Sequence, residues 1–292
     1  MTGDILSHIE QLYPSFSKGH KAIADYLLAH YEKAAFMTAA KLGRTVGVSE
    51  STVVRFATEL GFDSYQTLKQ TLHQLSRNRL TALQRVQITE DRVREDGVLG
   101  SVLANDILNI SQTLAHIDPR EFESAIEKIV SARNVYIVGV RTAGMLSEFL
   151  GFNLNLICDN IRLVDATGTE EVFEQILRIG EGDVIIGISF PRYSQRTIRA
   201  LNFARDRGAD VIAITDAPSS PLAQFATNLL LARSDMASFV DSLAAPMSLI
   251  NALIVGVTMR RRSEVEQRLG ELEQIWDEYQ VYDKTNGGVS DV

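Results

Sequence analysis

The chain has 292 residues and a net charge of −8, with 45% hydrophobic and 23% charged residues, enough for about two folded domains. Its single cysteine, Cys158, excludes an internal disulfide and a cysteine-based metal site. No basic segment precedes an apolar core at the start, and the longest apolar stretch, residues 244–257, is too short for a membrane helix of about 20 residues, so we expect a cytoplasmic protein without membrane contact.

Charge is unevenly distributed along the chain. The first 80 residues carry nine Lys or Arg and seven Asp or Glu, a net charge of +2, which leaves −10 for the remainder. Such an asymmetry indicates that the two parts have different partners, one of them anionic.

The first 75 residues have the apolar spacing of short helices. Ile5, Ile9 and Leu12 fall on one helical face. Four hydroxyl residues stand where further helices are expected to begin: Ser17, Thr38, Ser49 and Ser64. Serine and threonine are favoured there because the side-chain oxygen accepts a hydrogen bond from an N–H of the first turn. We therefore predict an all-α N-terminal domain.

Residues 38–60 are predicted to form two helices joined by a tight turn. Gly43 is a small residue where the helices approach closely, and Gly47 supplies the positive φ that ends the first helix. In a helix-turn-helix, the start of the second helix enters the DNA major groove; the alternative is a helical hairpin with an ordinary polar face. The candidate DNA contacts are Lys41, Arg44, Ser49, Ser51, Thr52 and Arg55.

Residues 78–98 are rich in charge and poor in apolar residues, and we predict a linker there. A helix is expected over residues 99–116. Asp118 and Pro119 then have the pattern of a helix cap followed by proline at the first helical position.

Short β-branched runs follow and alternate with helical patterns. Strands are expected at residues 135–139, 161–166, 183–189, 210–215 and 228–232. Helical patterns of ten or more residues separate the first four strands. Because the strands are continuous apolar runs, both faces of the sheet must be buried, which is typical of a parallel sheet covered by helices on both sides. Two closing helices are expected over residues 239–262 and 263–282.

The predicted fold class is an N-terminal all-α helix-turn-helix domain joined to a C-terminal α/β doubly wound parallel sheet of about five strands. The expected boundaries are a DNA-binding domain over residues 1–77, a linker over 78–98, a sheet domain over 99–282, and a disordered tail over 283–292.

Two loops of the sheet domain are candidates for binding a ligand. They follow the first and third strands, at residues 139–144 and 189–197, and both lead into helix starts, whose N–H groups attract anions. Ligands in such sheets bind past the carboxyl ends of the strands. The candidate residues are Gly139, Arg141, Thr142, Ser189, Arg192, Ser194 and Thr197. For Ser194 and Thr197 the alternative role is helix capping.

Residues 45–72, TVGVSESTVVRFATELGFDSYQTLKQTL, resemble the N-terminal domain of RpiR-type bacterial transcriptional regulators. The Gly-Val-Ser, Thr-Val, Arg-Phe, Leu-Gly-Phe and Leu-Lys elements of that family are all present. The resemblance covers nearly the whole chain, because such regulators carry a sugar isomerase (SIS) domain after the linker.

Residues 183–232 are similar to the core of that SIS domain. The family pattern Ser-x-Ser-Gly-x-Thr is kept only at Ser189 and Ser194, and in the family pattern Gly-x-Gly-x-Ser, Arg141 replaces the second glycine and Ala143 the serine. The resemblance implies a phosphosugar or a sugar acid as ligand. Arginine side chains fill space that glycines leave open, so a smaller or differently shaped anion, such as an organic acid or an amino-acid derivative, is also expected. Residues 219–223, SSPLA, resemble the family's capped helix start, with a packing role.

The resemblance implies a transcription regulator that binds operator DNA and a small anionic metabolite as a homodimer or homotetramer. We expect no cofactor, no metal and no catalysis, because all five histidines precede the sheet domain and the possible bases are more simply surface or capping acids. Those acids are Glu148, Glu170, Glu171 and Asp241. The alternatives are a regulator that uses the SIS domain only as a dimerising scaffold, and a sugar-phosphate isomerase.

Overall fold

The structure, a computed structural model, describes residues 5–76, 86, 97–165, 172–236 and 240–282. The expected tail at 283–292 and nearly all of the expected linker at 78–98 lie outside the described residues. The chain divides into two compact units, one built on the N-terminal helices and one on the sheet.

The N-terminal unit is helical, as expected. Its helices are α1 Ile5–Leu12, α2 Lys18–Ala34, α3 Ala39–Val46, α4 Glu50–Glu59 and α5 Tyr65–Ser76, with a 3-10 turn at Tyr13–Ser15. The four expected caps are confirmed, because each hydroxyl oxygen accepts from the N–H three residues later: those of Ser17, Thr38, Ser49 and Ser64. The apolar face of each helix closes one core, which includes the buried side chains of Ile9, Leu27, Phe56, Leu68 and Leu72.

The second unit contains a five-stranded parallel sheet, which confirms the predicted fold class. The strands are β1 Val135–Gly139, β2 Ile161–Val164, β3 Val184–Ile188, β4 Asp210–Thr215 and β5 Asn228–Leu231. Their order is β2-β1-β3-β4-β5. Each expected strand coincides with an observed strand, and the observed ends lie within two residues of the predicted ones.

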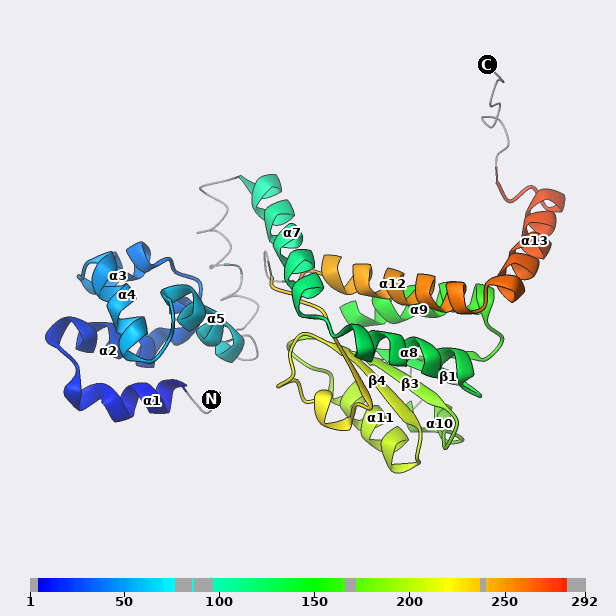
Figure 1. Cartoon of the computed structure of the whole chain (residues 1–292), viewed down its shortest axis with the longest axis horizontal. Helices are drawn as coiled ribbons and strands as arrows, with labels where there is room; N and C mark the ends of the chain where they lie inside the picture. The colour runs from blue at the N-terminus through cyan, green and yellow to red at the C-terminus, as the bar shows by residue number, and fades with distance from the viewer. Residues whose placement is uncertain (1–4, 77–85, 87–96, 166–171, 237–239, 283–292) are drawn as a thin grey trace, which may run out of the picture. The chain divides into compact units, whose positions relative to one another are not determined.

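Helices cover both faces of this sheet (Figure 1). On one face lie α8 Pro119–Ser131, α9 Thr142–Ile157 and α12 Ala244–Arg260; on the other lie α10 Val172–Gln175 and α11 Gln195–Asp206. Alternate side chains of β1 enter the two layers: Val135 and Ile137 belong to the first core, Tyr136 and Val138 to the second. Burial on both faces explains why the strands read as unbroken apolar runs.

The long helix α7, Val98–His116, precedes α8 and corresponds to the helix expected at 99–116. Asp118 caps α8 through its side chain, which accepts from the N–H of Arg120, and Pro119 opens the helix. In the described part of the chain, no helix is long and apolar enough to cross a bilayer.

The two closing helices are shorter than predicted. The first was expected from residue 239 but begins at Ala244, because the Ser242 hydroxyl bonds Asp106 of α7 at 2.6 Å and accepts from the N–H of Ala244 at 3.3 Å. The second, α13 Arg262–Glu278, ends four residues before 282. Gln280 adopts a φ of 51°, and the N–H of Val281 turns back to a carbonyl of α13. This backbone geometry stops the helix.

One connection differs from the expectation and another is described only in part. Between β2 and β3 a helical pattern of ten or more residues was predicted; residues 166–171 lie outside the described range, and the residues after them form α10 and turns. Residues 219–223 lead into a 3-10 turn, Ala223–Phe225, and not into a longer helix. There the buried Ser220 hydroxyl accepts from Thr215 Oγ1 and from the N–H of Leu222, which closes a tight turn.

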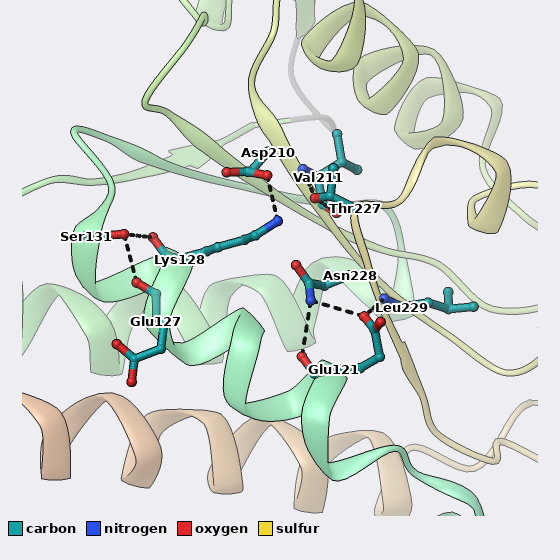
Figure 2. Close-up of polar contacts among 9 residues, drawn as sticks. All are labelled: Glu121, Glu127, Lys128, Ser131, Asp210, Val211, Thr227, Asn228 and Leu229. Atoms are coloured by element: carbon teal, nitrogen blue, oxygen red, sulfur yellow. Dashed lines mark hydrogen bonds and ion pairs between the residues drawn. The ribbon is translucent and has the colours of Figure 1, made fainter.

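Side chains of α8 bond to the first residues of β4 and β5 (Figure 2). Glu121 accepts from the N–H of Leu229 at 3.2 Å and from the Asn228 amide at 3.0 Å. Lys128 donates to Asp210 at 2.7 Å. The contact to Leu229 satisfies a backbone N–H of the edge strand β5, which would otherwise be open to pairing with another chain.

A buried carboxylate ties the start of β3 to the segment before β1. Asp183 accepts two hydrogen bonds from the Arg133 guanidinium, at 3.0 and 2.7 Å, one from Asn134 at 2.9 Å, and one from the N–H of Gly180 at 3.0 Å. Burial alone would raise the pKa of Asp183, but these donors outweigh it and hold the pKa below its ordinary value of 3.8.

Replacing Asp183 with asparagine is expected to lower the free energy of unfolding at neutral pH by about 2–3 kcal/mol, because charge-assisted hydrogen bonds are lost in a buried site. A depressed folded-state pKa stabilises the fold above the unfolded pKa, and this contribution is lost as the pH falls below it. Urea unfolding measured from neutral pH down to about pH 3 should therefore show a weaker pH dependence for Asp183→Asn. Parallel curves for the two proteins would contradict this role.

Candidate functional site

The turn between α3 and α4 depends on two glycines. Gly47 ends α3 with a φ of 76°, a left-handed conformation that favours glycine. A Cβ atom at Gly43 would lie 2.7 Å from the carbonyl oxygen of Val48, so a larger residue there would push the helices apart. The crossing of α3 and α4 therefore has the tight geometry that the sequence indicated.

The first turn of α4 gathers three hydroxyl groups. Ser49 Oγ lies 2.9 Å from Ser51 Oγ and 2.7 Å from Thr52 Oγ1, and it accepts from the N–H of Thr52. One turn later, Arg55 Nε donates to the carbonyl oxygen of Ser51 at 3.3 Å. The four side chains thus form one polar group at the N-terminal half of α4.

This polar group lies opposite the core-facing side of α4. Val53 and Phe56 are fully buried, whereas Ser51 and Arg55 are exposed. The other two candidate DNA contacts lie on α3, where Arg44 is exposed in the last turn and Lys41 is half-buried. All six candidates therefore belong to the two helices of the helix-turn-helix.

Helix α2 supports α4 from the inner side. A Cβ atom at Gly19 would lie 3.4 Å from the Thr52 methyl, and His20 Nδ1 lies 2.6 Å from Glu59 Oε2 at the other end of α4. The His20 ring also packs edge-on against Phe56. These contacts hold the orientation of α4, and the sequence had not singled out Gly19, His20 or Glu59.

The candidate ligand residues of the sheet unit meet where the strand order reverses. Strands β1 and β3 are parallel neighbours, with Gly139 paired to Ile188 at their carboxyl ends. From β1 the chain proceeds to β2 on one side, and from β3 it proceeds to β4 on the other. The loops after β1 and β3 therefore leave the same edge at the switch point, where ligands of such sheets bind. This topology brings all seven predicted residues to the carboxyl ends of β1 and β3, a region called the β1/β3 edge below.

The loop after β1 is short and tightly packed. A Cβ atom at Gly139 would lie 2.3 Å from Ser147 Oγ and 2.4 Å from the carbonyl oxygen of Ala143, so only glycine allows α9 to come this close. Arg141 follows with φ 59° and ψ −124°, and Thr142 begins α9. Both side chains are exposed.

The loop after β3 is held by its own hydrogen bonds. The buried Ser189 hydroxyl accepts from the N–H of Ser194 at 3.0 Å, and the Ser194 hydroxyl accepts from the N–H of Thr197 at 3.3 Å, which caps α11. Tyr193 donates to Asp216 at 2.7 Å. Arg192, between these fixed residues, is exposed. The capping role considered for Ser194 is therefore confirmed.

Three observations make this edge suited to an anion. The N-terminus of α11 presents backbone N–H groups and the positive end of a helix dipole. Thr197 is fully buried in its first turn, and its hydroxyl oxygen has no hydrogen-bond partner among the described residues. Neither Arg141 nor Arg192 is paired with a carboxylate in the part of the chain that the structure describes.

Tyr193 and Asp216 were missed in the sequence. Tyr193 stands next to Arg192, and Asp216 directly follows the strand expected at 210–215, so their positions in the chain were a usable signal. Their hydrogen bond, however, joins the ends of two different strands, and only the order of those strands brings them together.

Comparison with known proteins identifies both units. Residues 3–78 match the helix-turn-helix domain of the rpiR family, and residues 128–256 match the SIS domain. The chain belongs to the RpiR family. It is 26% identical over 233 residues to an uncharacterized HTH-type transcriptional regulator of Haemophilus influenzae, covering 79% of this chain and 80% of that protein. The chain is thus an RpiR-family transcription regulator with a SIS domain.

Two solved structures have the same fold. The sugar isomerase domain of an RpiR transcription factor from Sphaerobacter thermophilus is 29% identical, with a TM-score of 0.56, over 59% of this chain and 96% of that one. The NanR protein of Vibrio vulnificus, solved with ManNAc-6P, is 19% identical, with a TM-score of 0.57, over 94% of this chain and 99% of that one. The second similarity extends the shared fold across both units of this RpiR-family chain.

Proposed function

We propose that this regulator binds operator DNA through α3 and α4 and binds a small anionic metabolite at the β1/β3 edge of its SIS domain. The observation that carries the proposal is the meeting of two arginine-bearing loops and the α11 N-terminus at the switch point of the sheet. Binding of the metabolite changes the affinity for the operator. A ligand can do so only through its differential affinity for the DNA-binding and non-binding states.

The DNA step rests on the exposed polar side of α4. Entry of its N-terminal half into the major groove places Ser49, Ser51 and Thr52 near phosphates or base edges, and Arg55 near a guanine. Lys41 and Arg44 contact the phosphate backbone. Operator half-sites mirror a protein two-fold, so a homodimer or homotetramer is part of the proposal, acting in the cytoplasm. Exposed apolar side chains of α12, Val255 and Met259, suit contact with a second copy.

The effector is a phosphosugar, a sugar acid or another organic acid. The ManNAc-6P held by NanR supports the phosphosugar class, and the arginines that replace family glycines support acids. We propose sensing and not turnover, because Asp216, a described carboxylate at this edge, already accepts a hydrogen bond from Tyr193 at 2.7 Å. Of the four acids that the sequence offered as bases, Glu170 and Glu171 lie outside the described residues.

A thermal-shift screen of the full chain against sugar phosphates, sugar acids, organic acids and amino acids tests the sensor. A ligand that binds only the folded state raises the melting temperature by mass action. A hit that also alters operator affinity supports the proposal. Silence across all four classes would favour a SIS domain that serves only as a scaffold.

Replacing Arg192 with alanine is expected to abolish the response of operator binding to the effector found in that screen, while DNA binding without effector stays unchanged. The side chain is exposed, so the fold does not depend on it. Arg178→Ala is the matched control, because this exposed arginine precedes β3 and so lies toward the opposite edge of the sheet. Effector affinity that is equal in Arg192→Ala and the native protein would remove Arg192 from the site.

A further inference from the structure

One apolar side chain of the N-terminal unit is exposed where the packing of the unit gives no reason for it. Within described residues 5–76, Val54 is the only large hydrophobic side chain that is exposed, with a relative exposure of 40%. Val46 and Val48, which precede α4, are half-buried and pack against the core of this unit. Valine is also a poorer helix former than alanine, so neither packing nor helix propensity accounts for Val54.

The position of Val54 within α4 distinguishes it from an ordinary surface residue. Residues 51, 54, 55 and 58 have the spacing i, i+3, i+4 and i+7, which places them on one helical face, and all four are exposed. Val54 therefore lies at the centre of the face that carries Ser51 and Arg55. Isolated apolar residues are common on protein surfaces, but this one lies in the half of α4 that enters the major groove in the proposed function.

The polar side chains around Val54 form hydrogen bonds within the helix. Arg55 Nε donates to the carbonyl oxygen of Ser51, and Thr58 Oγ1 donates to the carbonyl oxygen of Val54, both at 3.3 Å. Ser51 Oγ lies 2.9 Å from Ser49 Oγ. These bonds favour side-chain positions along the helix, and the isopropyl group of Val54 remains exposed between them.

A face with hydrogen-bonding groups around one small apolar side chain has a specific counterpart in DNA. In the major groove the four bases present hydrogen-bonding groups and a single kind of methyl group, at C5 of thymine. The isopropyl group of valine has no donor or acceptor, so it favours the base that offers it this methyl group. A purine edge opposite Val54 would lose water from its polar atoms without gaining a hydrogen bond in exchange.

We infer that Val54 determines operator sequence by packing against the 5-methyl group of a thymine in each half-site. The inference rests on the DNA-binding function proposed above and narrows it, because it assigns a base to a residue that makes no polar contact with DNA. Removing one methyl group from an apolar contact changes affinity by about fourfold.

Replacing thymine with uracil in the operator removes only this methyl group and so tests the contact directly. Fluorescence anisotropy with the full chain and a duplex selected from a randomised pool measures Kd, with dT changed to dU at one position at a time. For the native protein, the change at one position of each half-site should raise Kd about fourfold. In Val54→Ala, Kd for the thymine duplex should rise by a similar factor, and the change to dU at that position should have no further effect.

Two controls separate this contact from a loss of folding or of general DNA affinity. Lys33→Ala, on the exposed side of α2, should keep the full response to dU, and Val54→Ala should not lower the melting temperature, because alanine favours a helix. An equal response to dU in Val54→Ala and the native protein would overturn the inference and leave the DNA-binding function intact. The same holds for a selected operator without thymine in its half-sites, or for a native protein that responds to dU at no position. If the native protein selects no duplex from the pool, both the inference and the DNA-binding function fail.

Discussion

Arg55→Ala should weaken specific operator binding by about 1–3 kcal/mol, or roughly 5- to 150-fold in Kd, because the variant loses a guanidinium that pairs with a base edge. The reason lies in α4: Arg55 is exposed one turn after Ser51, whose carbonyl oxygen orients its Nε. Fluorescence anisotropy with a duplex that the native protein selects from a randomised pool measures the loss. The melting temperature should not change.

Two controls make the assignment of α4 specific. Lys33→Ala removes an exposed cation from the last turn of α2, outside the helix-turn-helix, and should leave Kd unchanged. Arg44→Ala should weaken all sequences about equally and reduce the salt dependence, as for a phosphate contact. Operator affinity that survives Arg55→Ala would mean that α4 is not the recognition helix.

Gly139→Ala should destabilise the SIS unit by about 3 kcal/mol, because the added methyl group overpacks a junction that has no free space. Its Cβ would meet both Ser147 Oγ and the backbone carbonyl of Ala143 at less than 3 Å, and backbone cannot move aside as a flexible side chain can. Shifting the start of α9 would also displace Arg141, so effector binding should fall together with stability. Urea unfolding and calorimetric titration measure the two effects.

Gly270→Ala is the matched control for this change. Gly270 lies within α13, and a Cβ atom there would have no heavy atom within 4 Å. Alanine in place of an unconstrained helical glycine should stabilise by up to about 1 kcal/mol. Equal effects of the two substitutions would show that the crowding at Gly139 has been overestimated.

Much of the fold follows from short-range patterns in the sequence. The caps Ser17, Thr38, Ser49 and Ser64 were found because each bonds an N–H only three residues away. The five strands were found because burial on both faces requires a continuous apolar run. Gly43 and Gly47 indicated the helix-turn-helix turn. The close approach of the two helices restricts position 43 to a small residue, and the left-handed backbone conformation favours glycine at position 47.

Where helices end was less predictable. The start of α12 depends on Ser242, whose hydroxyl bonds Asp106 far back in the chain. The buried Ser220 turn likewise depends on Thr215 at the end of β4. The apolar periodicity continues through both segments, so it does not predict where these hydrogen bonds interrupt or delay a helix.

The sequence by itself determined the two-domain organisation, the RpiR-type helix-turn-helix and the residue types of both candidate sites, because caps, turns and buried strands act over a few residues. Only the tertiary structure decided that β1 and β3 are neighbours, that Tyr193 bonds Asp216, and that Arg141 stands in a glycine-like conformation. These features arise from strand order and from the packing of α9 against Gly139, which join residues far apart in the chain. A binding edge is assembled by that packing, and so its geometry cannot be read from any one segment.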